Sequence, residues 1–199
     1  MTPSTAKTIF KDRLPLAERY VKHLKTTGIE WGLMGPREAD IMWERHVLNC
    51  AIVNELMDAD STVIDIGSGA GLPGLTLAIA RPDLQLTLVE PLERRVQWLK
   101  MVVADLKLDN VKVFRNRAED LDIQSDYVTA RAVKALKTLL PMTLRLLKPH
   151  GQLIAIKGQS AQKEIYAAKK QLKNYDAEII LLGQQLLQTP TTVVQVQHS

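Results

Sequence analysis

Residues 63–74, which read VIDIGSGAGLPG, constrain the fold more than any other part of the chain. A short β-branched run at 63–66 is followed by glycines at 67, 69, 71 and 74, and then by an apolar run at 75–79 that suits a buried helix. A strand, a glycine turn and a helix in this order let a ligand lie against bare backbone near a helix N-terminus. The stretch therefore predicts a site for a nucleotide-type cofactor.

Strand and helix patterns alternate from this stretch onward. The predicted strands are 62–66, 85–89, 111–114, 126–130 and 152–157, and the predicted helices are 72–80, 91–107 and 133–147. Repeated β–α units of this length form a parallel sheet with right-handed crossovers. The sequence therefore predicts an α/β fold.

The end of the chain follows a different pattern. A helix is predicted at 161–173, and strands at 178–182 and 192–197. The connection between these two strands is short and contains Gly183 and Pro190, which favours an antiparallel hairpin at the edge of the sheet. The whole chain is then expected to form a mostly parallel, seven-stranded sheet.

Two helical segments precede the sheet, at 4–27 and 36–57, with Pro15 expected to kink or split the first and Gly28 to end it. Residues 1–58 are therefore predicted to form an N-terminal helical extension packed on a core at 59–199, the two making one structural domain.

The second helix carries an unusual arginine. At 100° per residue, Arg45 falls inside an apolar stripe that includes Ile41 and Leu48. An ion pair with a carboxylate at the edge of the core is the simpler interpretation, and a position facing the cofactor or substrate cleft is the functional one. His46 lies off the stripe and is interpreted as a hydrogen-bonded structural histidine.

Composition excludes several classes of protein. The 199 residues, 46% of them hydrophobic, suffice for one substantial core, and no apolar run approaches the length of a membrane span. The N-terminal residues lack the apolar segment of a signal peptide, so a cytoplasmic protein is expected. Cys50 is the single cysteine, which excludes an intramolecular disulfide and a multi-cysteine zinc site. A net charge of +4 is compatible with a nucleic-acid partner.

The glycines alone do not identify the cofactor, since Gly69, Gly71 and Gly74 match the G-x-G-x-x-G of dinucleotide sites. Asp65, however, would repel a pyrophosphate and could bind a cationic amino-acid group. Glu90 ends the next strand, where a carboxylate accepts hydrogen bonds from both hydroxyls of a ribose. A phosphate-free adenosine with a charged tail, S-adenosylmethionine, therefore fits better than NAD. An exposed Glu90 that merely opens the next helix is the alternative.

Further candidates follow the other strands, at the edge where ligands bind in such sheets. Arg117, Ala118 and Glu119 occupy the turn where an adenine ring is expected, with backbone groups of Ala118 and Glu119 able to contact its edge. Arg131 ends the fourth strand and Lys157 the fifth. Lys134, Lys137 and Lys148 are interpreted as a solvated face. No N-P-P-Y element and no evident His–carboxylate pair accompany the glycines.

These motifs together resemble a known family, the bacterial small-subunit ribosomal RNA guanine-N7 methyltransferases, also called glucose-inhibited division protein B. The resemblance spans about residues 30 to 160 and is carried by Arg45-His46 with Asn49, VIDIGSGAGLPG, Glu90 with Arg94-Arg95-Val96, Arg117-Ala118-Glu119, Arg131-Ala132 and Ile156-Lys157-Gly158. The segment at 32–50 resembles the actinobacterial-type variant and departs from the W-N-x-x-x-N-L-T element of many members, so no role of that element is carried over.

The resemblance implies a class I, Rossmann-like methyltransferase in which Gly67, Leu72, Ala118, Glu119 and Arg131 match cofactor-binding positions. The implied reaction moves a methyl group from S-adenosylmethionine to N7 of a guanine in the decoding-region loop of 16S ribosomal RNA, leaving S-adenosylhomocysteine. The implied partner is the small ribosomal subunit or an assembly intermediate, and a monomer without a metal ion is expected.

Guanine N7 carries a lone pair and no proton, so its methylation needs no general base. Arg131, Lys157 and Arg45 are therefore expected to act by positioning. Three alternatives stay open at this point: a methyltransferase acting on another substrate, an NAD-dependent oxidoreductase that uses the same glycines, and a non-catalytic RNA-binding protein.

Overall fold

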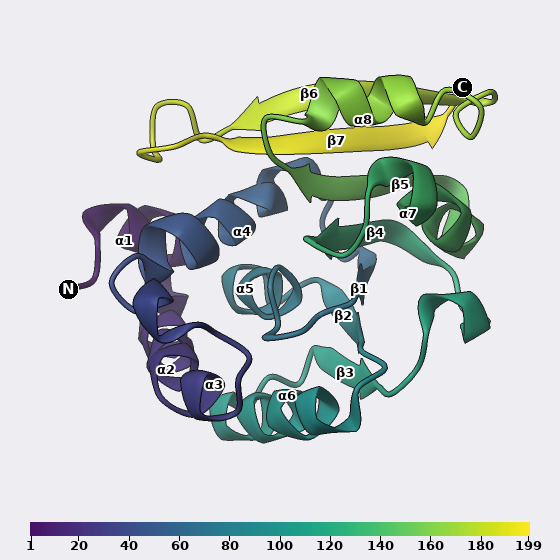
Figure 1. Ribbon diagram of the computed structural model, residues 1–199. Coiled ribbons are helices and arrows are strands. Elements are labelled where there is room, and N and C mark those ends of the chain that lie inside the picture. The colour runs from purple at the N-terminus through teal and green to yellow at the C-terminus, as the bar shows by residue number, and fades with distance from the viewer.

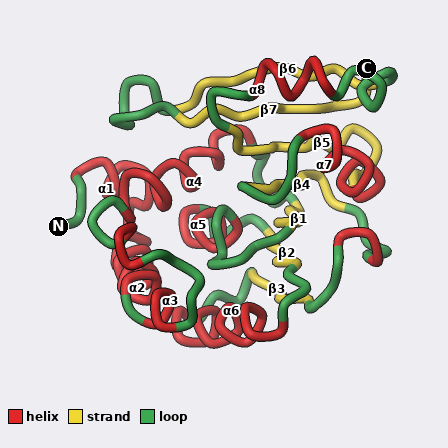
Figure 2. The backbone as a smooth tube through the Cα atoms, in the orientation of Figure 1, coloured by secondary structure: helices red, strands yellow, loops and turns green.

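A computed structural model describes residues 1–199 and contains one seven-stranded sheet in the order β3-β2-β1-β4-β5-β7-β6 (Figure 1). The strands are β1 (Thr62–Ile66), β2 (Gln85–Val89), β3 (Val111–Phe114), β4 (Ser125–Arg131), β5 (Leu147–Lys157), β6 (Tyr175–Leu182) and β7 (Thr191–His198). β1 to β5 pair in parallel, and β7 runs antiparallel to both of its neighbours. The predicted seven-stranded α/β sheet and its terminal hairpin, at the edge of the molecule in Figure 2, are confirmed.

Helices cover both faces of this sheet. They are α1 (Ser4–Phe10), α2 (Leu14–Lys25), α3 (Thr27–Glu30), α4 (Asn49–Ala51), α5 (Gly74–Ala80), α6 (Glu93–Leu106), α7 (Leu136–Thr143) and α8 (Ala161–Ala167). Shorter 3-10 turns lie at Lys11–Arg13, Pro36–Glu38, Ile52–Leu56, Ala118–Asp120 and Leu144–Leu146, and a π-helix at Met42–Leu48. None of the helices is long and apolar enough to cross a lipid bilayer.

Two hydrophobic clusters lie on opposite faces of the sheet. On β1, Val63 packs into the cluster formed with the N-terminal helices, α5 and α6, whereas Ile64 and Ile66 pack into the cluster formed with α7 and α8. A strand buried on both faces explains why apolar residues in its sequence do not simply alternate with polar ones. Trp98 of α6 is fully buried and joins the extension to the core, because its ring N–H donates to the Thr27 hydroxyl at 3.0 Å.

The N-terminal helices divide at different points from those predicted. The first break falls at Lys11–Arg13, and Pro15 lies in the first turn of α2, where its missing N–H has no helical partner to lose. Gly28 lies inside α3, not after a helix. A Cβ there would be 3.2 Å from the His23 carbonyl oxygen and 3.5 Å from Trp98, so a glycine allows close packing on α6.

Two later boundaries also differ from the prediction. β5 begins at Leu147, five residues before the predicted strand, and Lys148 therefore lies on this strand, paired with Asp126 of β4 at 2.9 Å. The helix predicted at 161–173 ends at Ala167 and continues as turns.

The largest correction concerns the helix predicted at 36–57. Its central part is the π-helix, whose wider i→i+5 turns rotate the later side chains away from their α-helical directions. Ile41 and Arg45 are consequently exposed, whereas Met42 and His46 are buried. The placement of Arg45 in a buried stripe is wrong, and its guanidinium forms neither the expected ion pair nor a wall of the cleft described below.

Candidate active site at the carboxyl edge of the sheet

The glycine turn after β1 runs as bare backbone along the carboxyl edge. Gly67 and Gly69 have φ values of +67° and +54°, a region that side chains other than hydrogen rarely adopt. A Cβ on Gly67 would lie 2.8 Å from a methyl of Val133, so the strand end packs directly against the segment that follows β4. The predicted strand, turn and helix are confirmed, with α5 starting at Gly74.

Asp65 lies beneath this turn and lines none of the hollows described below. The side chain is fully buried, and its Oδ2 accepts a hydrogen bond from the Gly74 amide at 3.1 Å. Burial raises the pKa of this carboxyl to about 7. A Cβ on Gly74 would come within 2.6 Å of Oδ2 and 2.2 Å of Leu88. Asp65 and Gly74 therefore shape the turn from below.

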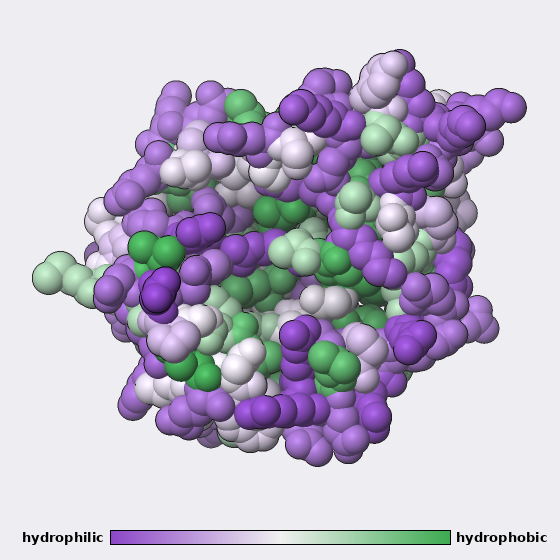
Figure 3. Space-filling model, viewed as in Figure 1, coloured by the Kyte–Doolittle hydropathy of each residue, from purple (hydrophilic) through white to green (hydrophobic).

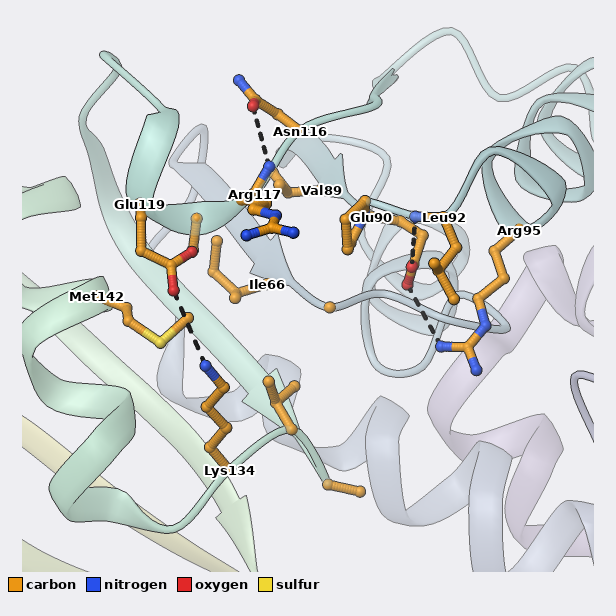
Figure 4. A pocket seen from close by; sticks show the side chains of 15 residues that line it. Ile66, Val89, Glu90, Leu92, Arg95, Asn116, Arg117, Glu119, Lys134 and Met142 are labelled. Carbon is orange, nitrogen blue, oxygen red and sulfur yellow. Dashed lines mark hydrogen bonds and ion pairs between the residues drawn. The ribbon is translucent and has the colours of Figure 1, made fainter.

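A cavity of about 500 Å³ opens on the other side of the turn, between the ends of β1, β2, β3 and β4 (Figure 4). Ile66, Val89 and Met142 supply apolar wall, with Glu90 and Arg95 on one side and Glu119 and Lys134 on the other. An apolar slot with a few polar groups at its ends suits a flat heterocycle joined to a sugar.

Glu90 is the buried charge of this cavity, with 1% of the residue exposed. Its Oε2 accepts from the Gly69 amide at 3.0 Å, and its Oε1 accepts from the Leu92 amide at 3.1 Å, while Arg95 lies 3.8 Å away. The alternative of an exposed, helix-opening residue is therefore wrong. Each carboxylate oxygen keeps a free lone pair, so the fixed side chain is able to accept two further hydrogen bonds from a ligand.

The turn after β3 forms the opposite end of the cavity. Arg145 donates to the carbonyl of Ala118 at 2.6 Å and to that of Leu121 at 2.7 Å, which fixes the turn from the protein side. The amides of Ala118 and Glu119 donate to no group of the protein and are available to a ligand. The Glu119 carboxylate pairs with Lys134 at 3.8 Å, and Lys134 lines the cavity while its side chain stays exposed to solvent, as predicted.

Arg131 lies in a second hollow of about 340 Å³, which the glycine turn separates from the first cavity. Its guanidinium donates to three groups of one helical segment: Cys50 Sγ at 3.4 Å, the Arg45 carbonyl at 3.4 Å and His46 Nδ1 at 2.7 Å. Arg45 thus contributes its backbone oxygen and not its side chain. The N-terminal extension holds the arginine that ends β4.

His46 Nε2 pairs with the carboxylate of Glu38, from the segment that also lines this hollow. A His–carboxylate pair does therefore stand beside the glycine turn, contrary to the prediction. A guanidinium only donates, so Nδ1 must accept from Arg131 and the ring proton is on Nε2, directed at Glu38. With both nitrogens engaged, the ring has no free site for a substrate proton. Burial lowers the pKa of His46, which keeps the ring neutral.

A third hollow, of about 460 Å³, lies between the ends of β4 and β5. Lys157 lines it, with its ammonium 2.9 Å from the Glu164 carboxylate and donating to the Lys134 carbonyl at 2.7 Å. The three hollows share lining residues, Ala132 in all of them, and form one cleft along the carboxyl edge. Figure 3 shows this view of the molecule hollowed near its centre, with hydrophobic residues at the floor and hydrophilic ones around it.

The chain matches the family model described as rRNA small subunit methyltransferase G over residues 13–185. It is 56% identical to the ribosomal RNA small subunit methyltransferase G of Paenarthrobacter aurescens over 196 residues, which cover 96% of this chain and 91% of that protein. It is 49% identical to the protein of the same name from Mycobacterium marinum, over 95% of this chain and 86% of that protein.

Solved structures share the fold at low sequence identity. A SAM-dependent methyltransferase from Aquifex aeolicus superimposes with a TM-score of 0.59 at 17% identity, over 79% of this chain and 93% of that chain. M. jannaschii TYW2 in complex with AdoMet gives a TM-score of 0.61 at 19% identity, over 81% of this chain and 80% of that chain. The Rossmann-like methyltransferase fold and the resemblance inferred from the sequence are confirmed, and the chain belongs to the rRNA small subunit methyltransferase G family.

Proposed function

We propose that this protein transfers a methyl group from S-adenosylmethionine to N7 of a guanine in 16S ribosomal RNA. Membership of the family supports the reaction and the RNA substrate. The structural observation that carries the proposal is Glu90, a buried carboxylate held by two backbone amides in the wall of a cavity of about 500 Å³. Such a group selects a ligand with neighbouring hydroxyls and no phosphate beside them.

The glycine turn itself distinguishes this cofactor from NAD. A dinucleotide site needs free amides at the turn to bind the pyrophosphate. Here the amides of Gly67 and Ser68 donate to the Val89 carbonyl, at 2.8 and 3.1 Å, and that of Gly71 donates to the Ser68 carbonyl at 2.6 Å. The Gly69 amide is taken by Glu90. A turn that is closed by its own hydrogen bonds and backed by carboxylates disfavours a pyrophosphate and suits S-adenosylmethionine.

The residues present fit each part of this cofactor. Glu90 is placed to accept from the ribose hydroxyls, and the free amides of Ala118 and Glu119 to donate to the adenine edge. Gly67 and Leu72 border the hollow that contains Arg131, which accommodates the amino-acid end. When bound, S-adenosylmethionine supplies an electrophilic methyl group on a sulfonium. The protein's part is to hold the acceptor in line with it.

Positioning accounts for the remaining candidate residues. The N7 lone pair needs no base and no metal ion, so the cations of the cleft orient the RNA and the cofactor. Arg131 and Lys157 are both held by hydrogen bonds inside the cleft. Arg45 and Arg37 are exposed beside it, Arg117 is exposed in the lining of the first cavity, and none of these three has a carboxylate partner. Free cations around the mouth suit phosphate contacts.

The finer parts of the proposal concern where the reaction occurs. The target guanine lies in the decoding-region loop, and the substrate is the small ribosomal subunit or an assembly intermediate. The protein acts on it as a monomer in the cytoplasm. Phosphate contacts at the mouth of the cleft and a buried cofactor site agree with a large RNA substrate that presents one base.

Methylation of small subunits that lack the modification tests the proposal. Labelled S-adenosylmethionine is expected to label 16S RNA at one position, and borohydride reduction followed by aniline is expected to cleave the RNA there, because that treatment breaks the chain at N7-methylguanine. Glu90→Ala serves as the control with a damaged cofactor site. Tight cofactor binding without any label in the RNA would contradict the RNA substrate, and label without aniline cleavage would contradict N7.

A further inference from the structure

His46 and Glu38 form a chain of hydrogen bonds that ends on Arg131. Two neighbouring segments, the 3-10 turn Pro36–Glu38 and the π-helix, supply it together with the distant end of β4. His46 and Glu38 line the same hollow as the glycine turn, and His46 is 9% exposed. Arg131 has no carboxylate within ion-pair distance, so its strongest contact is the neutral ring nitrogen at 2.7 Å.

We propose that His46 is a positioning residue that holds the Arg131 guanidinium at the wall of the cleft, in the single ring tautomer that Glu38 fixes. The inference rests on the proposed function. Without the Glu38 carboxylate, the ring is free to carry its proton on Nδ1, which would face the guanidinium donor to donor. The arginine would then leave the cleft wall and lose its orientation toward the cofactor or the RNA.

The same geometry makes Arg131 sensitive to acid. A proton added to Nδ1 removes the acceptor and places two cations in contact. The charged groups that face the ring are Glu38, Arg131 and Arg45. Burial lowers the pKa of His46, Arg131 and Arg45 lower it further, and Glu38 opposes them. Activity is therefore expected to fall at acid pH, where the ring gains its second proton.

Two substitutions separate the two nitrogens of the ring. In His46→Asn the side-chain oxygen replaces the Nδ1 acceptor for Arg131, and the contact with Glu38 is lost. In His46→Gln the amide reaches the Nε2 position and Glu38, and the acceptor for Arg131 is lost. Both replace a buried ring with an amide, so their stabilities are comparable and are measured by urea unfolding. His23→Gln is the matched control, because His23 pairs with Asp105 at 2.9 Å outside the cleft.

His46→Gln is expected to lower kcat/KM for small subunits about 10- to 100-fold, the effect of a lost hydrogen bond to a charged group, and His46→Asn to stay within a few fold of the unchanged protein. The loss of activity at acid pH should disappear in His46→Asn, which carries no titrating ring. Equal activities of the two variants, or an acid limb that persists in His46→Asn, would overturn the proposal.

A readout without turnover keeps this inference separate from the proposed function. The ¹⁵N shifts of the His46 ring in the free protein should show one tautomer, with the proton on Nε2, and a mixture in Glu38→Ala. A ring that is protonated on Nδ1 at pH 7.5, or is unaffected by Glu38→Ala, would contradict the positioning role. If the unchanged protein fails to methylate ribosomal subunits while the ring shows the Nε2 tautomer, the proposed substrate fails and the arrangement of Arg131 stands.

Discussion

Asp65 lies beneath the glycine turn and lines none of the hollows of the cleft. The sequence predicts its carboxylate at the wall of the cleft, where it would repel a pyrophosphate and bind a cationic group. The structure places it under the turn, fully buried and bonded to the Gly74 amide, with its Oδ1 lacking any partner in the protein. Its contribution is to hold the start of α5 against the end of β1, and its titration is thereby linked to folding.

The free energy of unfolding is expected to depend on pH through Asp65. Its pKa rises from 3.8 to about 7 on folding, because burial disfavours the charged form. Between these values the folded state binds more protons than the unfolded state, so the stabilisation falls as pH rises through this window and levels off above about 7. Asp65→Asn keeps an acceptor for the Gly74 amide and never ionises.

Urea unfolding at pH 5 and pH 8 measures this effect. As the pH rises from 5 to 8, the free energy of unfolding of Asp65→Asn is expected to increase relative to that of the unchanged protein, by on the order of a few kcal/mol. If the two proteins differ in free energy of unfolding by the same amount at both pH values, Asp65 does not titrate in this range.

Glu90→Ala is expected to weaken S-adenosylmethionine binding by about 1.5–3 kcal/mol, the scale of hydrogen bonds to a charged group. Gly69→Val should weaken it more, because its φ of +54° excludes a β-branched side chain and the turn borders the cleft. Isothermal titration with the folded variants measures both. NAD is the control ligand, and NAD binding that exceeds S-adenosylmethionine binding would reverse the choice of cofactor.

Arg131→Lys is expected to lose much of the rate, because a lysine ammonium cannot reproduce contacts to a thiol, a carbonyl and an imidazole with one planar fork.

Single-turnover methylation should be independent of pH from about 6 to 9, since no base takes part. A rate that climbs with hydroxide across this range and then levels off would indicate a general base.

At the scale of elements, the difference between prediction and structure is concentrated in the π-helix. Periodicity of 3.6 residues places Arg45 inward and His46 aside, and the wider turns reverse this arrangement. No local sequence pattern predicts a π-helix, because its stability comes from tertiary contacts such as those of Arg131 with the Arg45 carbonyl and His46. Cys50 and Arg145 escaped prediction for the same reason: their roles are contacts with distant segments.

The junction of β1 and α5 was predictable, and it yields a stability prediction. Gly74 packs α5 tightly against the sheet, since a Cβ there would lie 2.2 Å from Leu88. Gly74→Ala is expected to destabilise the fold by about 1–3 kcal/mol through overpacking. Gly158→Ala is the matched control, because nothing lies within 4 Å of its Cβ position. Urea unfolding compares them, and equal stabilities would show that the helix shifts freely.

At the scale of the whole molecule, sequence reasoning is most accurate where the chain alternates strand and helix. β1, β2 and β3 begin and end where the sequence predicts, because each is a short stretch rich in apolar residues that is bounded by turn residues. The cleft could be placed at the carboxyl edge on the same grounds. Which residues line it depends on how the N-terminal helices dock, and no periodicity encodes that.

Binding of the small subunit is expected to weaken as salt rises. Arg37, Arg45 and Arg117 are exposed in or beside the cleft, and each neutralised phosphate of single-stranded RNA adds about −0.7 to the slope of log K against log salt. Replacing all three with alanine should therefore make the slope less negative by about 2. Filter binding at salt concentrations from about 50 to 300 mM measures this slope.

The control for this variant is an equal change of charge away from the cleft. Lys7, Lys11 and Lys107 are exposed on α1, just after it and at the end of α6. Their replacement should leave the slope unchanged. An equal effect of the two triple variants would mean that the RNA responds to net charge and not to the mouth of the cleft.

The strand order has a consequence for biosynthesis. β6 is made before β7 but has no other partner in the sheet, since β7 lies between it and β5. Translation proceeds from the N-terminus, so the first five strands are able to assemble while β6 waits with its backbone unpaired. β6 can therefore join the sheet only after β7 has been made and has paired with β5.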